Sequence, residues 1–119
     1  MLFIEYPKCS TCQKAKMWLD AHGIDYTDRD IRQDNPSSEE PGAWQAASGI
    51  PLKTLFNTSG MLYRSMGLKD KLPEMAPEEQ MALLATDGML VKRPLVVDGD
   101  TVLAGFKPKD WAAHFGVEE

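Results

Sequence analysis

Residues 6–12, Tyr-Pro-Lys-Cys-Ser-Thr-Cys, decide how the rest of this chain is interpreted, because they contain its only two cysteines. The apolar run at residues 2–6 predicts a short buried strand that Pro7 ends. After the cysteines, apolar residues follow helical spacing as far as Gly23, which is a natural helix stop, and residues 24–31 predict a second strand. A Cys-x-x-Cys pair that opens a helix between two strands is typical of thiol redox chemistry.

The two cysteines are predicted to differ in reactivity. Cys9 falls at the N-terminal end of the helix, where free N–H groups and the helix dipole stabilise a thiolate. Lys8 adds a positive charge, and Ser10 or Thr11 can cap the helix and assist the thiolate or a substrate. Cys12 lies about one turn further along and is more sheltered. We therefore expect Cys9 to be the nucleophile and Cys12 the resolving thiol.

Other uses of the cysteine pair are less favoured. A structural disulfide over so short a loop would restrict the unfolded chain little. A closed zinc site needs four ligands, and the only histidines, His22 and His114, stand apart from each other and from the cysteines. Two buried, inert cysteines remain an alternative. The redox pair is the favoured interpretation, and no metal is expected.

Composition bounds the class of protein. The 119 residues correspond to one domain spanning 1–119, and 43% hydrophobic with 26% charged residues excludes wholesale disorder. The net charge of −5 argues against general nucleic-acid binding. The start of the chain lacks the basic region of a signal peptide, and no apolar run is long enough for a membrane span. We therefore expect a cytoplasmic protein.

The rest of the chain predicts helices followed by a hairpin. Turn and capping signals, with apolar residues at helical spacing, indicate a helical insertion over about 36–88. Strands are predicted at 94–98 and 101–104 around Asp-Gly-Asp at 98–100, and a last helix runs from Pro108 to a stop at Gly116. The order is therefore βαβ, helices, ββα.

This order, together with the Cys-x-x-Cys pair, resembles the arsenate reductase (ArsC)/Spx family, a thioredoxin-like group with a helical insertion. The stretches that carry the resemblance are residues 6–15, 55–60, 92–99 and 105–106. The resemblance implies a thioredoxin-like α/β fold with a mixed sheet flanked by helices. It also implies that Cys9 is the reactive cysteine, that Arg93 lies beside its sulfur, and that Pro94 is a cis proline facing the dithiol.

The chain departs from the arsenate reductases of this family at two positions. They carry two further arginines that hold the oxyanion, where this sequence has Asn57 and Gly105. The only nearby cation that the sequence offers in their place is Lys107. Conversely, arsenate reductases of the glutaredoxin-coupled type often lack the second cysteine, whereas Cys12 would let this protein close its own disulfide.

Three functions are compatible with these features. The favoured one is a cytosolic thiol-disulfide oxidoreductase, with no bound cofactor and with glutathione or a thioredoxin- or glutaredoxin-type partner as reductant. The second is an arsenate or related oxyanion reductase that uses glutathione and glutaredoxin. The third is an Spx-like redox-switched regulator that binds the RNA polymerase α subunit and no nucleic acid directly, although the mid-chain shows no match to the polymerase-contacting loop of those regulators.

Overall fold

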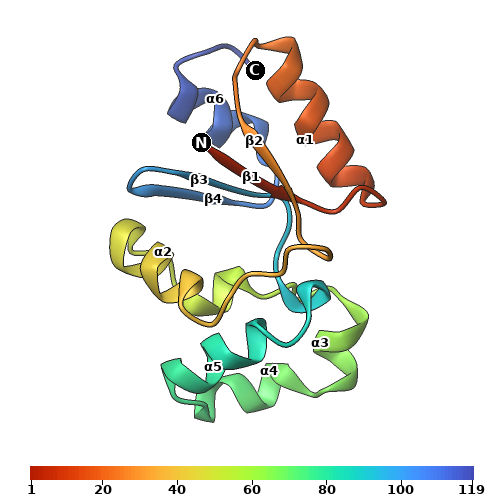
Figure 1. The fold of residues 1–119 in the computed structure, drawn as a ribbon, viewed down its shortest axis with the longest axis vertical. Helices are drawn as coiled ribbons and strands as arrows, with labels where there is room; N and C mark the ends of the chain where they lie inside the picture. Colours follow the sequence, from red (N-terminus) through yellow and green to blue (C-terminus); the bar gives the residue numbers. More distant parts are fainter.

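Four short strands form one mixed sheet in the computed structural model, which describes residues 1–119 (Figure 1). The central strand β1 (Leu2–Glu5) pairs in parallel with β2 (Thr27–Asp30) and antiparallel with β3 (Leu95–Asp98). The strand β4 (Thr101–Ala104) pairs antiparallel with β3, which gives the order β2-β1-β3-β4. This sheet, with helices around it, confirms the predicted thioredoxin-like α/β fold.

Helices lie on both sides of the sheet (Figure 1). On one side are α1 (Ser10–Ala21) and α6 (Pro108–Phe115). The other side carries the helical insertion, whose elements are α2 (Glu40–Ser48), η1 (Leu52–Leu55), α3 (Met61–Ser65), α4 (Leu68–Lys71), η2 (Leu72–Glu74), α5 (Pro77–Leu84) and η3 (Gly88–Leu90). These elements occupy the segment where the sequence predicts an insertion. None of the helices combines the length and hydrophobicity that a membrane crossing requires.

The alternation of side chains along the strands divides the core into two clusters. Phe3 and Val96 pack on one face of the sheet, against residues of α1 and α6 that include Trp111. Their neighbours Ile4 and Leu95 point to the opposite face, where the helical insertion covers them. Successive side chains of a strand face opposite ways, so both faces of these strands must be apolar.

The second strand is shorter than the sequence indicates. It was expected over 24–31, but β2 begins at Thr27. The apolar residues Ile24 and Tyr26 precede the ladder and pack instead against the cluster beneath α1 and α6. Their alternation therefore reflects burial in a connection, not strand pairing.

Candidate active site

Cys9 itself caps the N-terminus of α1. Its backbone is extended, with φ −88° and ψ 119°, and its sulfur accepts a hydrogen bond from the backbone N–H of Cys12 at 3.3 Å. The expectation that Ser10 or Thr11 caps the helix is therefore wrong, because the helix begins at Ser10 and the capping position falls on the cysteine. A sulfur at this position meets the free N–H groups and the positive end of the helix dipole, which favour a thiolate.

Cys12 is fully buried one turn behind Cys9. Burial raises the pKa of the Cys12 thiol to about 12, and the charges of Cys9 and Glu5 add to this effect. The thiol of Cys12 is thus held in its protonated form near neutral pH, while Cys9 is only partly buried. Cys9 is therefore the more accessible of the two thiols.

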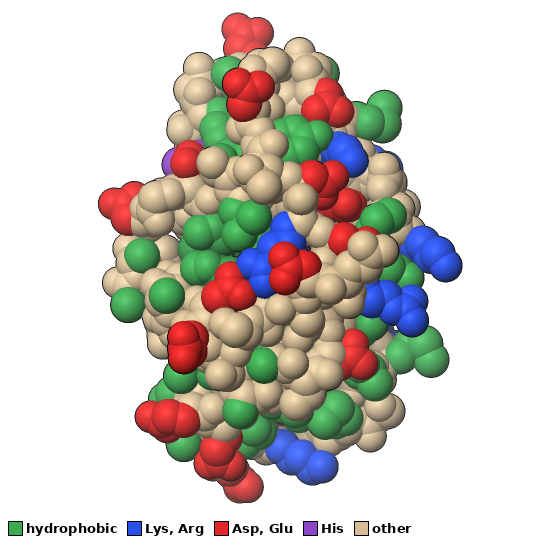
Figure 2. Space-filling view, viewed as in Figure 1, with side chains coloured by type: hydrophobic (Ala, Val, Ile, Leu, Met, Phe, Trp, Pro, Cys, Tyr) green, Lys and Arg blue, Asp and Glu red, His purple; other side chains and the backbone are tan.

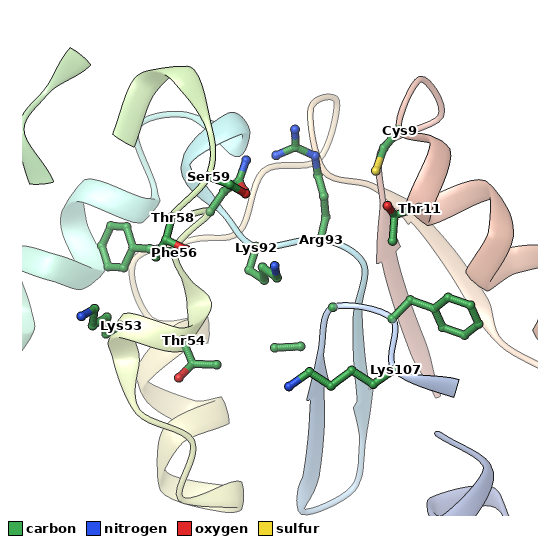
Figure 3. A pocket seen from close by; sticks show the side chains of 14 residues that line it. Cys9, Thr11, Lys53, Thr54, Phe56, Thr58, Ser59, Lys92, Arg93 and Lys107 are labelled. Carbon is green, nitrogen blue, oxygen red and sulfur yellow. The ribbon is translucent and has the colours of Figure 1, made fainter. Parts of the chain in front are cut away.

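A cleft of about 590 Å³ opens beside Cys9, and we call it the cationic cleft (Figure 3). Of the residues proposed from the sequence, those that line it are Cys9, Thr11, Asn57, Arg93 and Lys107. The cleft also takes in side chains from η1, from the loop after it and from the segment between η3 and β3. In Figure 3, Arg93 lies between Cys9 on one side and the loop of Thr58 and Ser59 on the other.

Backbone pairing between distant segments builds the wall opposite Cys9. The N–H of Asn57 donates to the carbonyl of Leu90 at 2.7 Å, and the N–H of Lys92 donates to the carbonyl of Leu55, also at 2.7 Å. These bonds fix the loop after η1 against the segment that leads to Arg93. The Arg93-Pro94 peptide bond is cis, as the family resemblance implies.

The guanidinium of Arg93 is held by neutral groups only. Its Nη1 donates to the carbonyls of Met89 and Val91 at 3.4 and 3.3 Å, and the group stands 5.6 Å from the centre of the Tyr6 ring. Its Nε is buried and has no hydrogen-bond partner. No carboxylate neutralises this charge. The positive charge of Arg93 is therefore free to act on an anion in the cleft.

The cationic cleft contrasts with the acidic surface of the protein. Its lining includes four cationic side chains and no acidic one, the cations being Lys53, Lys92, Arg93 and Lys107. None of them forms a salt bridge. The chain as a whole carries a net charge of −5, and Figure 2 shows acidic side chains spread over one whole face. Such a concentration of unpaired positive charge attracts anionic ligands.

Sequence analysis did not identify two of these four cations, Lys53 and Lys92. Lys107 was expected to be the only cation replacing the missing arginines, and this expectation is wrong. The side chain of Lys92 runs past Gly105: a Cβ built on that glycine would lie 3.1 Å from the Lys92 Cε, and the glycine has φ +75°. An arginine at position 105 would therefore strain the backbone and displace Lys92. The sequence signal that could have indicated Lys92 is its position directly before Arg93.

The other residues proposed from the sequence lie outside the cleft lining. Lys8 and Ser10 are exposed, whereas Cys12 and Pro94 are buried behind the surface. No group of three or more potential metal ligands comes together. The two histidines are engaged elsewhere: His22 contacts the carbonyls of Trp18 and Glu118, and His114 pairs with Asp98 at 2.9 Å.

A dithiol at the start of a helix, in a thioredoxin-like fold and beside an unpaired arginine, is typical of sites for thiol redox chemistry. The ArsC family model matches residues 4–114, and the chain belongs to the ArsC family. The Bacillus subtilis protein YusI, which is uncharacterised, is 50% identical over 94% of this chain and 98% of its own. The B. subtilis regulatory protein MgsR is 28% identical over 91% of this chain and 84% of its own.

Solved structures agree with this assignment. An ArsC family related protein from Bacteroides fragilis is 58% identical and superposes with a TM-score of 0.89 over 94% of each chain. A protein described as a possible arsenate reductase, from Streptococcus mutans, is 45% identical, with a TM-score of 0.83 over 92% of this chain and 95% of its own. The Spx regulator of Staphylococcus haemolyticus is more distant, at 26% identity over 84% of this chain and 75% of its own.

Proposed function

We propose that this protein is a thiol-dependent reductase that acts on a disulfide whose substituents carry negative charge. The observation that carries the proposal is the position of Cys9: its sulfur sits at the N-cap of α1, on the rim of a cleft with four unpaired cations and no acid. A nucleophilic thiolate and an anionic substrate are both favoured by this arrangement.

The first chemical step is attack of the Cys9 thiolate on one sulfur of the substrate disulfide. A mixed disulfide forms on Cys9 and the first substrate thiol leaves. The helix N-terminus and Arg93 stabilise the thiolate before the attack, and the lysines of the cleft hold the anionic substituents. Cys12 then attacks the Cys9 sulfur, releases the second substrate thiol and closes the Cys9–Cys12 disulfide.

The oxidised dithiol must be reduced again for turnover. Glutathione or a thioredoxin- or glutaredoxin-type protein is the proposed reductant, which fits a reducing compartment such as the cytoplasm. Glutathione itself is anionic at neutral pH, since its carboxylates outnumber its amine. The same cleft therefore suits glutathione as the reductant of the oxidised dithiol, and suits its disulfide as a probe of the attack by Cys9.

A comparison of substrates of opposite charge tests the proposal. Glutathione disulfide and cystamine are both small disulfides, but the first is anionic and the second is a dication. We expect glutathione disulfide to form a mixed disulfide on Cys9 at least about tenfold faster at low salt, and the difference to shrink as added salt screens the cleft. Mass spectrometry of the protein identifies the adduct. Equal rates at low salt would overturn the proposed substrate class.

Arsenate reduction is a second candidate, and a specific observation favours it. Lys53 and Lys92 supply cations that the sequence did not place near Cys9, so the cleft offers an oxyanion more donors than Arg93 and Lys107 alone. The solved Streptococcus mutans relative, described as a possible arsenate reductase, adds support. Arsenate-dependent oxidation of the dithiol, in the presence of glutathione and glutaredoxin, would favour this candidate over the first.

The regulator hypothesis keeps a simple test of its own. Relatives with regulatory names are 26% and 28% identical to this chain. Co-purification of the protein with RNA polymerase through the α subunit, in place of turnover of disulfides, would favour it over both reductases.

A further inference from the structure

The strand β4 leaves one edge of the sheet unpaired. In the order β2-β1-β3-β4 it is a terminal strand, so it pairs with β3 on one side only. All four of its residues are partly exposed. Proteins commonly protect such edges with a charged residue, a proline or a covering element. The sequence of β4, Thr-Val-Leu-Ala, contains neither a charge nor a proline, so this edge keeps the ability to accept another strand.

The register of β4 shows which backbone groups face the free edge. The N–H of Gly105 donates to the carbonyl of Pro94 at 2.8 Å, and in an antiparallel ladder every second residue bonds to the neighbouring strand in this way. Leu103 therefore bonds to β3, whereas the N–H and C=O groups of Val102 and Ala104 point away from the sheet. No backbone group of another segment bonds to them.

A hollow of about 210 Å³ lies along this edge. Side chains from both faces of the sheet line it: Val102 and Ala104 belong to the face that the helical insertion covers, and Leu103 to the face of α1 and α6. Because neighbouring residues of a strand point to opposite faces, a hollow that all three line opens at the edge of the strand. The other lining residues are Ile50, Thr54, Lys107, Asp110 and Trp111.

This hollow is continuous with the cationic cleft, because Thr54, Ala104 and Lys107 line both. In Figure 3, the side chain of Lys107 extends toward Thr54, and Cys9 lies farther along the cleft. A strand added to β4 would lie three strand spacings from β1, about 14 Å, which about four extended residues span. A segment bound at the edge can therefore continue through the cleft to Cys9.

The charges of the two parts indicate which side chains such a segment carries. At the junction, the ammonium of Lys107 has no salt-bridge partner, and the cleft beyond it contains no acid. The hollow contains one acid, Asp110, beside the apolar side chains of Ile50, Val102 and Leu103. Apolar side chains therefore suit the hollow, and acidic ones suit the cleft.

We propose that the free edge of β4 binds an extended segment of a protein substrate, whose apolar residues lie beside Val102 and whose acidic residues continue into the cationic cleft, where its disulfide meets Cys9. This inference rests on the proposed function, because it names the disulfide substrate as a protein. Backbone pairing with Val102 and Ala104 supplies affinity for any strand, whereas the hollow and the cleft select side chains. A second copy of this chain, paired through the same edge, is the competing occupant.

Peptide binding tests the docking without thiol chemistry. The probe is a fluorescent peptide, Thr-Val-Thr-Val-Glu-Asp-Glu-Gly-Ser, in which serine stands for the reactive cysteine. The matched control is methylated on the backbone nitrogens of its apolar half, so it keeps its charge but cannot pair as a strand. Fluorescence anisotropy with the full-length protein should show at least about tenfold weaker binding of the control. Equal affinities would overturn the inference.

A variant of the edge repeats this test from the side of the protein. The N–H of Val102 points away from β3, so Val102→Pro removes an edge donor at a position where sheets tolerate proline. The variant should bind the first peptide at least about tenfold more weakly and should no longer discriminate between the two peptides. Discrimination equal to that of wild type would overturn the inference. If the variant does not fold, the two peptides on wild type still decide.

Peptide charge is tested separately. A peptide with lysine in place of its three acids should bind wild type at least about tenfold more weakly at low salt, and the difference should shrink as salt is added. Equal binding at low salt would overturn the acidic character of the partner. A wild-type dimer in sedimentation equilibrium that Val102→Pro converts to a monomer, with no preference between the first peptide and its methylated control, would overturn the inference in favour of a second copy.

Reaction of the cysteine form of the peptide separates this inference from the proposed function. As a mixed disulfide with thionitrobenzoate, its sulfur forms a bond to Cys9, and thionitrobenzoate leaves as a thiolate with the electron pair of the broken S–S bond. Docking of the serine peptide, with no adduct from this disulfide or from glutathione disulfide, would overturn the proposed function and support the docking. An adduct from glutathione disulfide, with no preference between the first peptide and its methylated control, would overturn the docking alone.

Discussion

The two sides of the dithiol carry opposite charge. On the open side, the cationic cleft brings four unpaired cations beside Cys9. On the buried side, Cys12 lies near Glu5, whose pKa the neighbouring carboxylates of Asp28 and Asp30 raise and the ammonium of Lys16 lowers. A short helical turn separates these regions, yet each would stabilise a different protonation state of a thiol.

This difference assigns the roles of the two cysteines more firmly than their spacing does. Positive charge favours a thiolate and attracts an anionic substrate, so the open side suits the nucleophile. Burial and nearby carboxylates favour the neutral thiol, so the buried side suits a group that stays protonated until the mixed disulfide has formed. The two sides are therefore consistent with the proposed reaction, in which Cys9 reacts first and Cys12 follows.

Replacing the cysteines one at a time is the strongest test of the difference between their roles. Cys9→Ser should abolish disulfide reduction, at least about 10³-fold, because the remaining thiol is buried and protonated. Cys12→Ser should still react once and then accumulate a mixed disulfide on Cys9, visible as a mass increase in the intact protein. Comparable activity of the two serine variants would mean that the cysteines are interchangeable.

The burial of Glu5 leads to a separate prediction about stability. Folded Glu5 keeps its proton up to about pH 7, whereas in the unfolded chain the group titrates near its ordinary value of 4.5. Between these values the folded state binds more protons, so the free energy of unfolding should fall as pH rises from 4.5 to 7 and then level off. The loss is on the order of 3 kcal/mol.

Urea denaturation at a series of pH values measures this slope. In E5Q the group cannot titrate, so the decline attributed to Glu5 should disappear. Glu40→Gln is the matched control, because the hydrogen bonds from Arg29 lower the pKa of the Glu40 carboxyl. Its contribution to stability therefore has the opposite sign and is lost only as pH falls below 4.5. A wild-type protein whose stability is flat from pH 5 to 7 would show that Glu5 is not buried as a neutral acid.

Sequence reasoning recovered the parts of this molecule that are encoded locally. The βαβ start, the hairpin at 98–100 and the dithiol follow from turn residues and short-range periodicity. The helix cap was predicted one or two residues too late, because Ser10 and Thr11 are of residue types that cap helices more often than cysteine does. Such a preference does not determine at which residue the helix begins.

The charge asymmetry could not be predicted in the same way. Lys53 and Lys92 are distant in sequence and line the same cleft only because the loop after η1 pairs with the segment before β3. Glu5 follows an apolar run and could equally end a strand at the surface. Its burial depends on α1 and β2 closing over it, which is a property of the assembled fold.

Arg93 is the cation whose removal should affect the open side most. Its guanidinium lines the cleft with Cys9 and has no carboxylate partner, so Arg93→Ala should slow alkylation of Cys9 by iodoacetamide at neutral pH about tenfold. Arg93→Lys restores the charge and should recover part of the rate. An unchanged rate in Arg93→Ala would show that Arg93 does not stabilise the Cys9 thiolate.

The two cleft lysines should have a smaller effect that depends on the substrate. In a Lys53→Gln, Lys92→Gln double variant, we expect reaction with glutathione disulfide to slow about fivefold at low salt, and reaction with cystamine to be no slower. Lys69→Gln with Lys71→Gln is the matched control, since it removes the same charge from two exposed positions on α4. Equal losses in both double variants would attribute the effect to net charge and not to the cleft.

The smallest effect is expected at Lys8, although it is adjacent to Cys9 in the sequence. Its side chain is exposed and does not line the cationic cleft, so solvent and salt screen its charge from a substrate there. Lys8→Gln should therefore change the rate of Cys9 alkylation less than about twofold at physiological ionic strength. The rates at which Lys8→Gln and Lys92→Gln react with glutathione disulfide then compare a cation outside the cleft with one inside it. A loss at Lys8 as large as that at Arg93 would show that proximity in sequence, and not the cleft, governs the reactivity of Cys9.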